Sequence, residues 1–419
     1  WLEAAPGWTH ELLVLTPHGV PVPDAITAAG EVLRGAHPYP DADGEASTRR
    51  LLEVAAGLGA DDLLVVLVSG GPSVTADFPP HLHEVRLPEL RMDADFRELQ
   101  AADGRDLEEV KRARRQALFT LFRRQRPDLF LIELYPFGRR AFRFEIDPVL
   151  EAIAGGDLPA CRVACSVRDI LVEKQRAPDR EAWTVAQLNR YFGAVLIHTD
   201  PRLVALQETF GRLAEIRIPV VSTGFIAPRP PPEARSRVRS RLGLNASERL
   251  IIVSAGGGSV GFPLLQACMR AFTLLPQRRS ARMIVFTGPF MPEAEIGRLR
   301  GLAGGPVELQ RFSTDFLSEL AAADLSVSMG GYNTSMNLLA AQVPALVWPF
   351  AQNREQRLRA ERLAQLGALQ VIEDNDLAPA QLATAMERML ERRTRPVVDI
   401  DLNGAVHTAH WIEAWCAAG

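Results

Sequence analysis

The sequence contains no run of about 18 or more apolar residues, the length that a helix needs to cross a bilayer. The longest apolar runs, such as Leu63–Val68, have the length of a strand. The first residues, Trp1-Leu2-Glu3-Ala4, lack the basic start and apolar stretch of a signal peptide. These absences favour a cytoplasmic protein without a transmembrane segment and leave open only a peripheral contact with a membrane.

Cysteine is also scarce. The four cysteines, at positions 161, 165, 268 and 416, have the spacing of neither a zinc cage nor a disulfide framework, so we expect buried, reduced thiols. A net charge of −4 gives no reason to expect binding to nucleic acid. No Asp-x-Asp pair stands at a predicted strand end, and the pair in Asp41-Ala42-Asp43 lies in a loop. We therefore expect neither a metal nor a cofactor.

What the sequence does contain is an alternation of short β-rich apolar runs with longer helical patterns. This alternation is typical of parallel sheets joined by crossover helices. A chain of 419 residues exceeds what one hydrophobic core usually serves, so two domains are expected. Consecutive prolines at 230–232 place a stiff linker over residues 227–236. Ligands of such sheets bind at the carboxyl ends of strands, which puts the expected site in a cleft between the domains.

The apolar runs and helical patterns predict the following strands and helices. In the first half they are Glu11–Thr16, Asp62–Val68, Leu129–Leu134, Cys161–Ser166, Ala194–His198 and Glu215–Pro219, with a helix over Leu107–Arg124. In the second half the strands are Arg249–Ser254, Arg282–Thr287, Leu325–Ser328 and Pro344–Pro349, and the helices are Phe262–Leu275, Asp315–Ala322, Thr334–Ala341 and Glu355–Leu366.

Three strand-to-helix junctions in the second half carry residues suited to a ligand. The first, Ser254–Gly261, contains three consecutive glycines that let backbone N–H groups approach a phosphate at a helix N-terminus. The second, Met329–Thr334, combines two glycines with Asn333 and Thr334, which either cap the helix or bind a ligand. The third, Pro349–Arg357, offers amides and arginines that can bind hydroxyls or phosphate. A tight turn and a solvated helix start are the alternatives for the first and third.

These junctions, in this order, make residues from about 73 to 418 resemble the GT-B glycosyltransferases related to the peptidoglycan enzyme that adds N-acetylglucosamine to lipid I. The resemblance is strongest to a bacterial branch of predicted glycosyltransferases, and it extends to residues 134–140, 166–171, 198–201 and 359–363. It implies an α/β protein with two Rossmann-like, doubly wound parallel-sheet domains facing a central cleft. Residues 73–226 would form the acceptor-side domain. Residues 237–419 would bind the nucleotide-sugar, and a last helix near Thr408–Ala417 would cross back to the first domain.

The resemblance also implies the donor-binding residues. They are Gly257, Gly258 and Ser259 for the diphosphate or nucleoside, Gly330, Gly331, Asn333 and Thr334 against the diphosphate, and Gln352 and Gln356 toward the sugar. One position departs from the family. The peptidoglycan enzyme has a glutamate for the ribose hydroxyls where this chain has Asn337, an amide without the charge of a carboxylate.

The N-terminal segment resembles a different family. Residues from about 11 to 71 are similar to the N-terminal part of bacterial glycerate 2-kinases, on the stretches 35–44, 51–58 and 61–71. Residues 1–72 are too short to be a kinase. We expect them to complete the first domain as a strand–helix–strand unit, with its helix over Glu45–Ala56, docked on the remaining sheet. They lack the Gly-rich loop with histidine that opens the glycosyltransferase family.

The favoured function is a metal-independent glycosyltransferase that moves a sugar from a nucleoside diphosphate, with a UDP-sugar preferred, to an unknown acceptor. His18, Asp169 and Glu133 are the candidates for the general base. Two alternatives remain: a nucleotide-sugar 2-epimerase, and a nucleotide-sugar-binding protein without turnover. The absence of the family's N-terminal loop favours the second of these.

Overall fold

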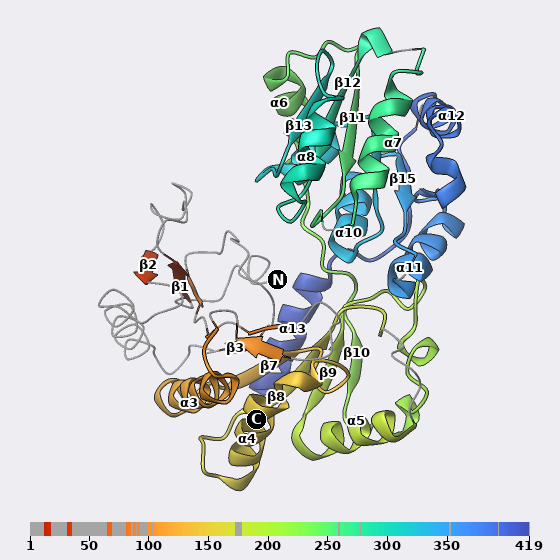
Figure 1. Cartoon of the computed structure of the whole chain (residues 1–419). Coiled ribbons are helices and arrows are strands. Elements are labelled where there is room, and N and C mark those ends of the chain that lie inside the picture. Colours follow the sequence, from red (N-terminus) through yellow and green to blue (C-terminus); the bar gives the residue numbers. More distant parts are fainter. Residues whose placement is uncertain are drawn as a thin grey trace.

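A computed structural model describes residues 104–171, 178–258, 260–276, 278–351, 353–392 and 394–418, with short backbone stretches before residue 104. These residues form two α/β domains, one above the other in Figure 1, each built around a parallel sheet. None of the described helices has both the length and the apolar character to cross a membrane.

The first domain is built on a five-stranded sheet in the order β10-β9-β8-β7-β3, with every neighbouring pair parallel. The strands are β3 (Val65–Val68), β7 (Leu129–Glu133), β8 (Arg162–Val167), β9 (Ala194–Ile197) and β10 (Val220–Ser222). The crossover helices are α3 (Leu107–Gln125), α4 (Arg143–Gly155) and α5 (Pro178–Tyr191). Side chains alternate between the two faces of the sheet, so Phe130 and Ile132 pack with Phe122 of α3, while Leu129 and Leu131 face the other side.

One predicted strand is wrong. The segment predicted as a strand over Glu215–Pro219 begins instead in a 3₁₀ turn, Leu213–Glu215, and the strand β10 starts only at Val220. The apolar pattern is short here, and backbone pairing decides the boundary: β10 pairs with β9 from Val220 to Ser222. Other 3₁₀ turns lie at Arg140–Phe142, Leu206–Glu208, Arg278–Ser280 and Asp374–Leu377.

The N-terminal segment joins the first domain only in part. β3 pairs in parallel with β7, as the predicted docking requires. The strand β1 (Leu12–Pro17), however, pairs with β2 (Val32–Gly35) and β4 (His81–Glu84) in a separate three-stranded sheet. The prediction that both strands belong to one unit on the main sheet is therefore wrong for β1. The predicted helix Glu45–Ala56 lies outside the described residues. Strands β5 (Leu90–Met92) and β6 (Leu99–Ala101) form an antiparallel pair.

The second domain contains a six-stranded parallel sheet in the order β13-β12-β11-β14-β15-β16. The strands are β11 (Arg249–Ser254), β12 (Ala281–Phe286), β13 (Val307–Gln310), β14 (Leu325–Met329), β15 (Ala345–Trp348) and β16 (Gln370–Val371). The helices are α6 (Ala234–Arg241), α7 (Phe262–Phe272), α8 (Glu293–Arg300), α9 (Phe316–Ala322), α10 (Tyr332–Ala341), α11 (Arg354–Gln365) and α12 (Pro379–Leu390). Both faces of the sheet are buried, which explains why β11 and β14 read as continuous apolar or small-residue runs.

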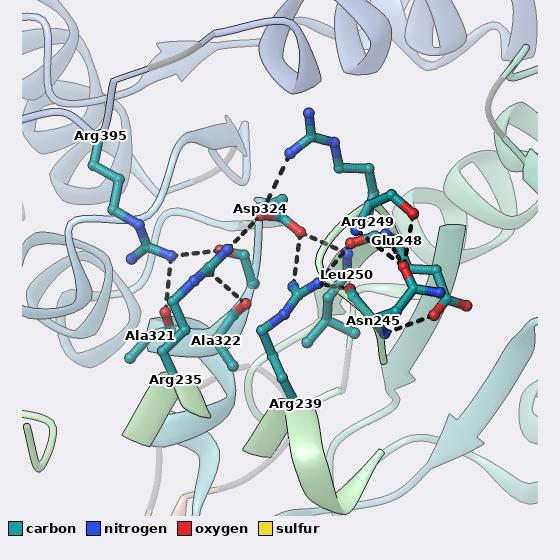
Figure 2. A network of polar contacts seen from close by, with 12 residues as sticks. Arg235, Arg239, Asn245, Glu248, Arg249, Leu250, Ala321, Ala322, Asp324 and Arg395 are labelled. Carbon is teal, nitrogen blue, oxygen red and sulfur yellow. Dashed lines mark hydrogen bonds and ion pairs between the residues drawn. The ribbon is translucent and has the colours of Figure 1, made fainter. Parts of the chain in front are cut away.

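An arginine network closes the amino-terminal end of this sheet (Figure 2). Asp324, just before β14, accepts hydrogen bonds from Arg235 at 2.8 Å, from Arg239 at 3.2 Å and from the N–H of Leu250 at 2.9 Å. Arg235 and Arg395 also donate to backbone carbonyls at the C-terminal end of α9. The network ties α6 and α9 to β11 at the end of the sheet opposite to the loops that follow its strands.

The last helix, α13 (Gly404–Ala417), packs on the first domain, where Figure 1 shows it beside β7 and β8. Ile412 lies in a cluster with Leu129, Leu131, Ala164 and Leu196 on the face of the sheet away from α3. The preceding segment reaches back through backbone bonds, since Phe225 N–H donates to Asp401 O at 2.8 Å and Gly404 N–H donates to Phe225 O at 2.9 Å. Both ends of the second domain are thus connected to the first.

Candidate functional site

The topology brings the three glycine- and amide-bearing junctions to one edge of the second domain. β11 pairs with β14, and β14 pairs with β15, all in parallel. The loops that follow these three strands therefore leave the sheet side by side at its carboxyl edge. In Figure 1, helices α10 and α11, which begin at two of these loops, lie at the end of the second domain that meets the first.

The glycine-rich loop after β11 is braced by the loop after β12. Phe290 N–H donates to Gly257 O at 2.9 Å. Gly258 has a φ of +92°, and a Cβ atom there would lie 2.2 Å from Thr287 O. Gly258 is therefore required by a backbone conformation and by contact between loops, and its Cα does not border an open path for a phosphate. Ser259 lies outside the described residues.

Helix α10, which follows the loop after β14, begins without a side-chain cap. Gly331 is the N-cap residue, and Asn333 and Thr334 lie within the first turn of the helix, so the alternative in which one of them is the N-cap is wrong. Asn333 is exposed, and Thr334 and Asn337 are half-buried on the first turns of the helix. The first N–H groups of a helix have no partner within it and carry a partial positive charge, which suits an anion.

The loop after β15 is organised by its own amides. Asn353 caps α11 by accepting the N–H of Gln356 at 3.1 Å. The side-chain oxygen of Gln356 accepts the N–H of Phe350 at 3.3 Å. A Cβ atom on Gly330 would lie 3.4 Å from Gln356 O, so this loop and the loop after β14 touch. Gln356 both shapes the loop and lies beside the second junction, while Gln352 lies outside the described residues.

Asp169 is held in an ion pair between the domains. Its carboxylate accepts two hydrogen bonds from Arg359 of α11, at 2.5 Å and 3.0 Å, and its side chain is fully buried. A fully buried carboxylate whose two oxygens both accept hydrogen bonds from a guanidinium is not accessible to the hydroxyl group of an acceptor. The geometry thus argues against the predicted role of Asp169 and assigns it a structural one. His18 lies outside the described residues.

The first domain also carries a row of polar side chains, of which only Glu133 was predicted as a candidate base. Glu133, Ser166, His198 and Thr223 stand at or just after the carboxyl ends of β7, β8, β9 and β10. Glu133 is the register partner of Ser166. Because successive side chains of a strand point to opposite faces of the sheet, all four side chains of the row lie on the face that α13 covers. Ser166 Oγ lies 2.7 Å from His198 Nε2, and Thr223 Oγ1 lies 2.9 Å from His198 Nδ1.

The row includes one strongly perturbed group. Burial lowers the pKa of His198 to about 4, although the nearby carboxylate of Glu133 acts to raise it. The imidazole is therefore neutral at pH 7, with both nitrogens in hydrogen bonds. Glu133 is itself paired with Arg139 at 2.5 Å and with Arg168 at 2.8 Å. A histidine directly after an apolar strand, in the run Ala194–His198, was the available sequence signal for this row.

Within the part of the chain that the structure describes, no three His, Cys, Asp or Glu side chains gather closely enough to hold a metal ion. The described cysteines carry no disulfide, and burial raises the pKa of the Cys165 thiol.

Two parallel-sheet domains with a strand-end site in the second define the GT-B class, and a solved structure supports this fold. The structure of the glycosyltransferase VinC in complex with dTDP is similar to this one. The match covers 98% of this chain and 100% of VinC, with a TM-score of 0.50 and 15% sequence identity. Identity at this level shows the fold alone.

The family comparisons divide the chain in two. Residues 252–403, which span all three junctions, match the glycosyltransferase family 28 C-terminal domain. Residues 2–115 match a separate family, a domain of unknown function called DUF4147. Both predicted resemblances are confirmed: the second half is glycosyltransferase family 28-like, and the N-terminal segment resembles a different family.

Curated relatives match less than half of the chain. An uncharacterized glycosyltransferase of Methanopyrus kandleri is 24% identical over 197 residues, 46% of this chain and 54% of its own. A UDP-N-acetylglucosamine–N-acetylmuramyl-(pentapeptide) pyrophosphoryl-undecaprenol N-acetylglucosamine transferase of Brucella anthropi is 28% identical over 193 residues, 45% of this chain and 50% of its own. The chain thus spans about half the length of the curated relatives that it matches.

Proposed function

We propose that this protein is a glycosyltransferase whose second domain binds a nucleoside-diphosphate sugar at the loops that follow β11, β14 and β15. The observation that carries the proposal is the start of α10. Gly331 caps the helix without a side-chain bond, next to the glycine-rich loop of the adjacent strand. Backbone N–H groups and the helix dipole would bind the diphosphate there and stabilise it as a leaving group without a metal.

A UDP-sugar is the proposed donor. The Brucella anthropi relative is named for UDP-N-acetylglucosamine, and the family match over residues 252–403 covers all three loops. Asn337 lies on the second turn of α10, where its amide would bind a ribose hydroxyl without the help of a charge. Gln356 would contact the sugar.

The acceptor would approach from the first domain and lose a proton there. Besides His18, the pair Ser166 and His198 is a candidate to receive this proton, because His198 is neutral and hydrogen-bonded to a half-buried hydroxyl at a strand end. Ser166 would contact the acceptor hydroxyl and pass the proton to His198 Nε2.

Binding without turnover remains the second candidate function, and the burial of Asp169 favours it because one predicted base is not available. A nucleotide-sugar 2-epimerase would require acids and bases around the sugar. Product analysis separates these functions. Incubation with UDP-N-acetylglucosamine and a panel of acceptors should release UDP in step with a glycosylated product. An epimerised sugar on UDP would favour the epimerase, and nucleotide binding without either product would favour the binding protein.

A further inference from the structure

Arg359 lies on α11 with its side chain fully buried, and its guanidinium contacts three separate parts of the chain. Nε and Nη2 donate to the two oxygens of Asp169, in the loop after β8 of the first domain. Nη1 donates to the carbonyl oxygen of Gly330, directly after β14, at 3.2 Å. Nη2 also contacts Glu355 one turn earlier on α11. One side chain thus joins the first domain to two of the three candidate donor loops.

The bond to Gly330 orients the peptide unit between Gly330 and Gly331. In a trans peptide the C=O and N–H groups point in opposite directions. Because the carbonyl of Gly330 faces the buried guanidinium, the N–H of Gly331 faces away from it. On Gly331, a Cβ atom would meet no nearer described atom than Thr334 Oγ1, at 3.9 Å. The Cβ direction of Gly331 is therefore open among the described residues at the start of α10.

We propose that Arg359 is a positioning residue for the donor diphosphate, and that Asp169 of the first domain holds it in place. The inference rests on the proposed function, since it assigns the outward N–H of Gly331 to a phosphate oxygen. It adds that a residue of the acceptor-side domain sets the affinity of the other domain for the donor.

The charges explain why an arginine and a carboxylate from the other domain are needed. A guanidinium that water does not reach requires counter-charges, which Asp169 and Glu355 provide. Its planar fork spans Asp169 and Gly330 at the same time, which the point charge of a lysine cannot do. The ring of Tyr332, the first residue of α10, also lies 5.3 Å from this guanidinium. Loss of Asp169 would free Arg359 to turn away from Gly330.

The test compares UDP with uridine, which lacks the diphosphate, by calorimetry on the full chain. Arg359→Lys and Asp169→Asn should each weaken UDP binding by about tenfold or more, and uridine binding by less than about twofold. Arg362→Met is the matched control, because Arg362 makes an exposed pair between the domains with Glu208, at 2.7 Å, from the same helix. This control should bind both compounds like the unaltered chain. Equal losses for UDP and uridine, or an unchanged UDP affinity in folded Arg359→Lys, would overturn the proposal.

Amide hydrogen exchange on the ligand-free chain tests the same geometry without any nucleotide. Exchange over residues 330–334 should be faster in Arg359→Lys than in Arg362→Met, at matched thermal stability. Equal protection in the two variants would overturn the positioning role even if UDP binds. If neither UDP nor dTDP binds the unaltered chain, the proposed function fails, and the exchange measurement still decides whether Arg359 orders this loop.

Discussion

The carbonyl oxygen of Thr287 lies 2.2 Å from the point that a Cβ atom on Gly258 would occupy. Together with the φ of +92°, this contact excludes any side chain at position 258 without movement of the loop after β12. Gly258→Val should therefore lower the free energy of unfolding by roughly 2–4 kcal/mol and abolish UDP binding at the same time. Thermal unfolding and calorimetry measure the two effects.

Gly257→Ala is the matched control for this loop. A Cβ atom there would lie 3.5 Å from a ring carbon of Phe290, an ordinary contact. This variant should keep its stability. A stable Gly258→Val protein that binds UDP normally would show that the loop adapts and that the contact with Thr287 is not needed.

Gln356→Glu should reduce discrimination between donor sugars more than affinity for UDP alone. Glutamate keeps an oxygen that accepts the N–H of Phe350, so the loop after β15 should remain in place. It removes the amide N–H₂ that would bind a sugar hydroxyl, and such a donor contributes nothing when the sugar is absent. Affinities for UDP and for two UDP-sugars measure the difference. Equal losses for all three ligands would assign Gln356 a structural role.

The stability of the protein should fall as the pH drops from 6.5 to about 4 because of His198. Its pKa is lowered to about 4 in the fold, so the unfolded chain takes up this proton first and is favoured as the pH falls. The contribution amounts to about 3 kcal/mol over this window. His198→Gln can keep bonds to Ser166 and Thr223 and should flatten this part of the profile. Denaturant titrations at several pH values measure the free energy of unfolding of both proteins. If this free energy falls equally steeply with decreasing pH in both, the assignment to His198 is wrong.

Asp324→Asn should destabilise the second domain without changing the affinity for UDP. Burial alone would raise the pKa of Asp324, but its bonds to Arg235 and Leu250 lower it, so the carboxylate is charged in the network of Figure 2. Loss of that charge should cost roughly 3 kcal/mol in unfolding free energy. The network lies at the amino-terminal end of the strands, away from the loops, so a large change in UDP affinity in folded protein would contradict this separation.

The sequence patterns predicted the strand ends well where an apolar run begins and ends abruptly. β11 and β14 lie close to their predicted positions, because both strands are buried on two faces and bounded by glycines or polar residues. Helix α6 was not predicted, because its sequence, ARSRVRSR, alternates arginine with small residues and shows no apolar stripe.

The arrangement around the site could not be read from local pattern. The adjacency of the loops after β11 and β14 depends on strand order, and these strands are separated by two others in the chain. The sequence distinguishes Arg359 only as part of a stretch similar to the family, since its partner Asp169 stands 190 positions earlier. The polar row around His198 depends on the register of four strands, which no single segment determines.

The most direct test of the account is a titration of UDP into the unaltered chain and into Gly331→Val. Gly331 has a φ of −61° and a ψ of 152°, which valine adopts easily, and its Cβ position faces open space among the described residues. Valine should therefore leave the fold intact and occupy the place of the phosphate. The account predicts that UDP binds the unaltered chain at one site and that Gly331→Val, with an unchanged melting temperature, loses this binding. Equal UDP affinity in the two folded proteins would contradict it, because the diphosphate would then lie elsewhere than at the start of α10.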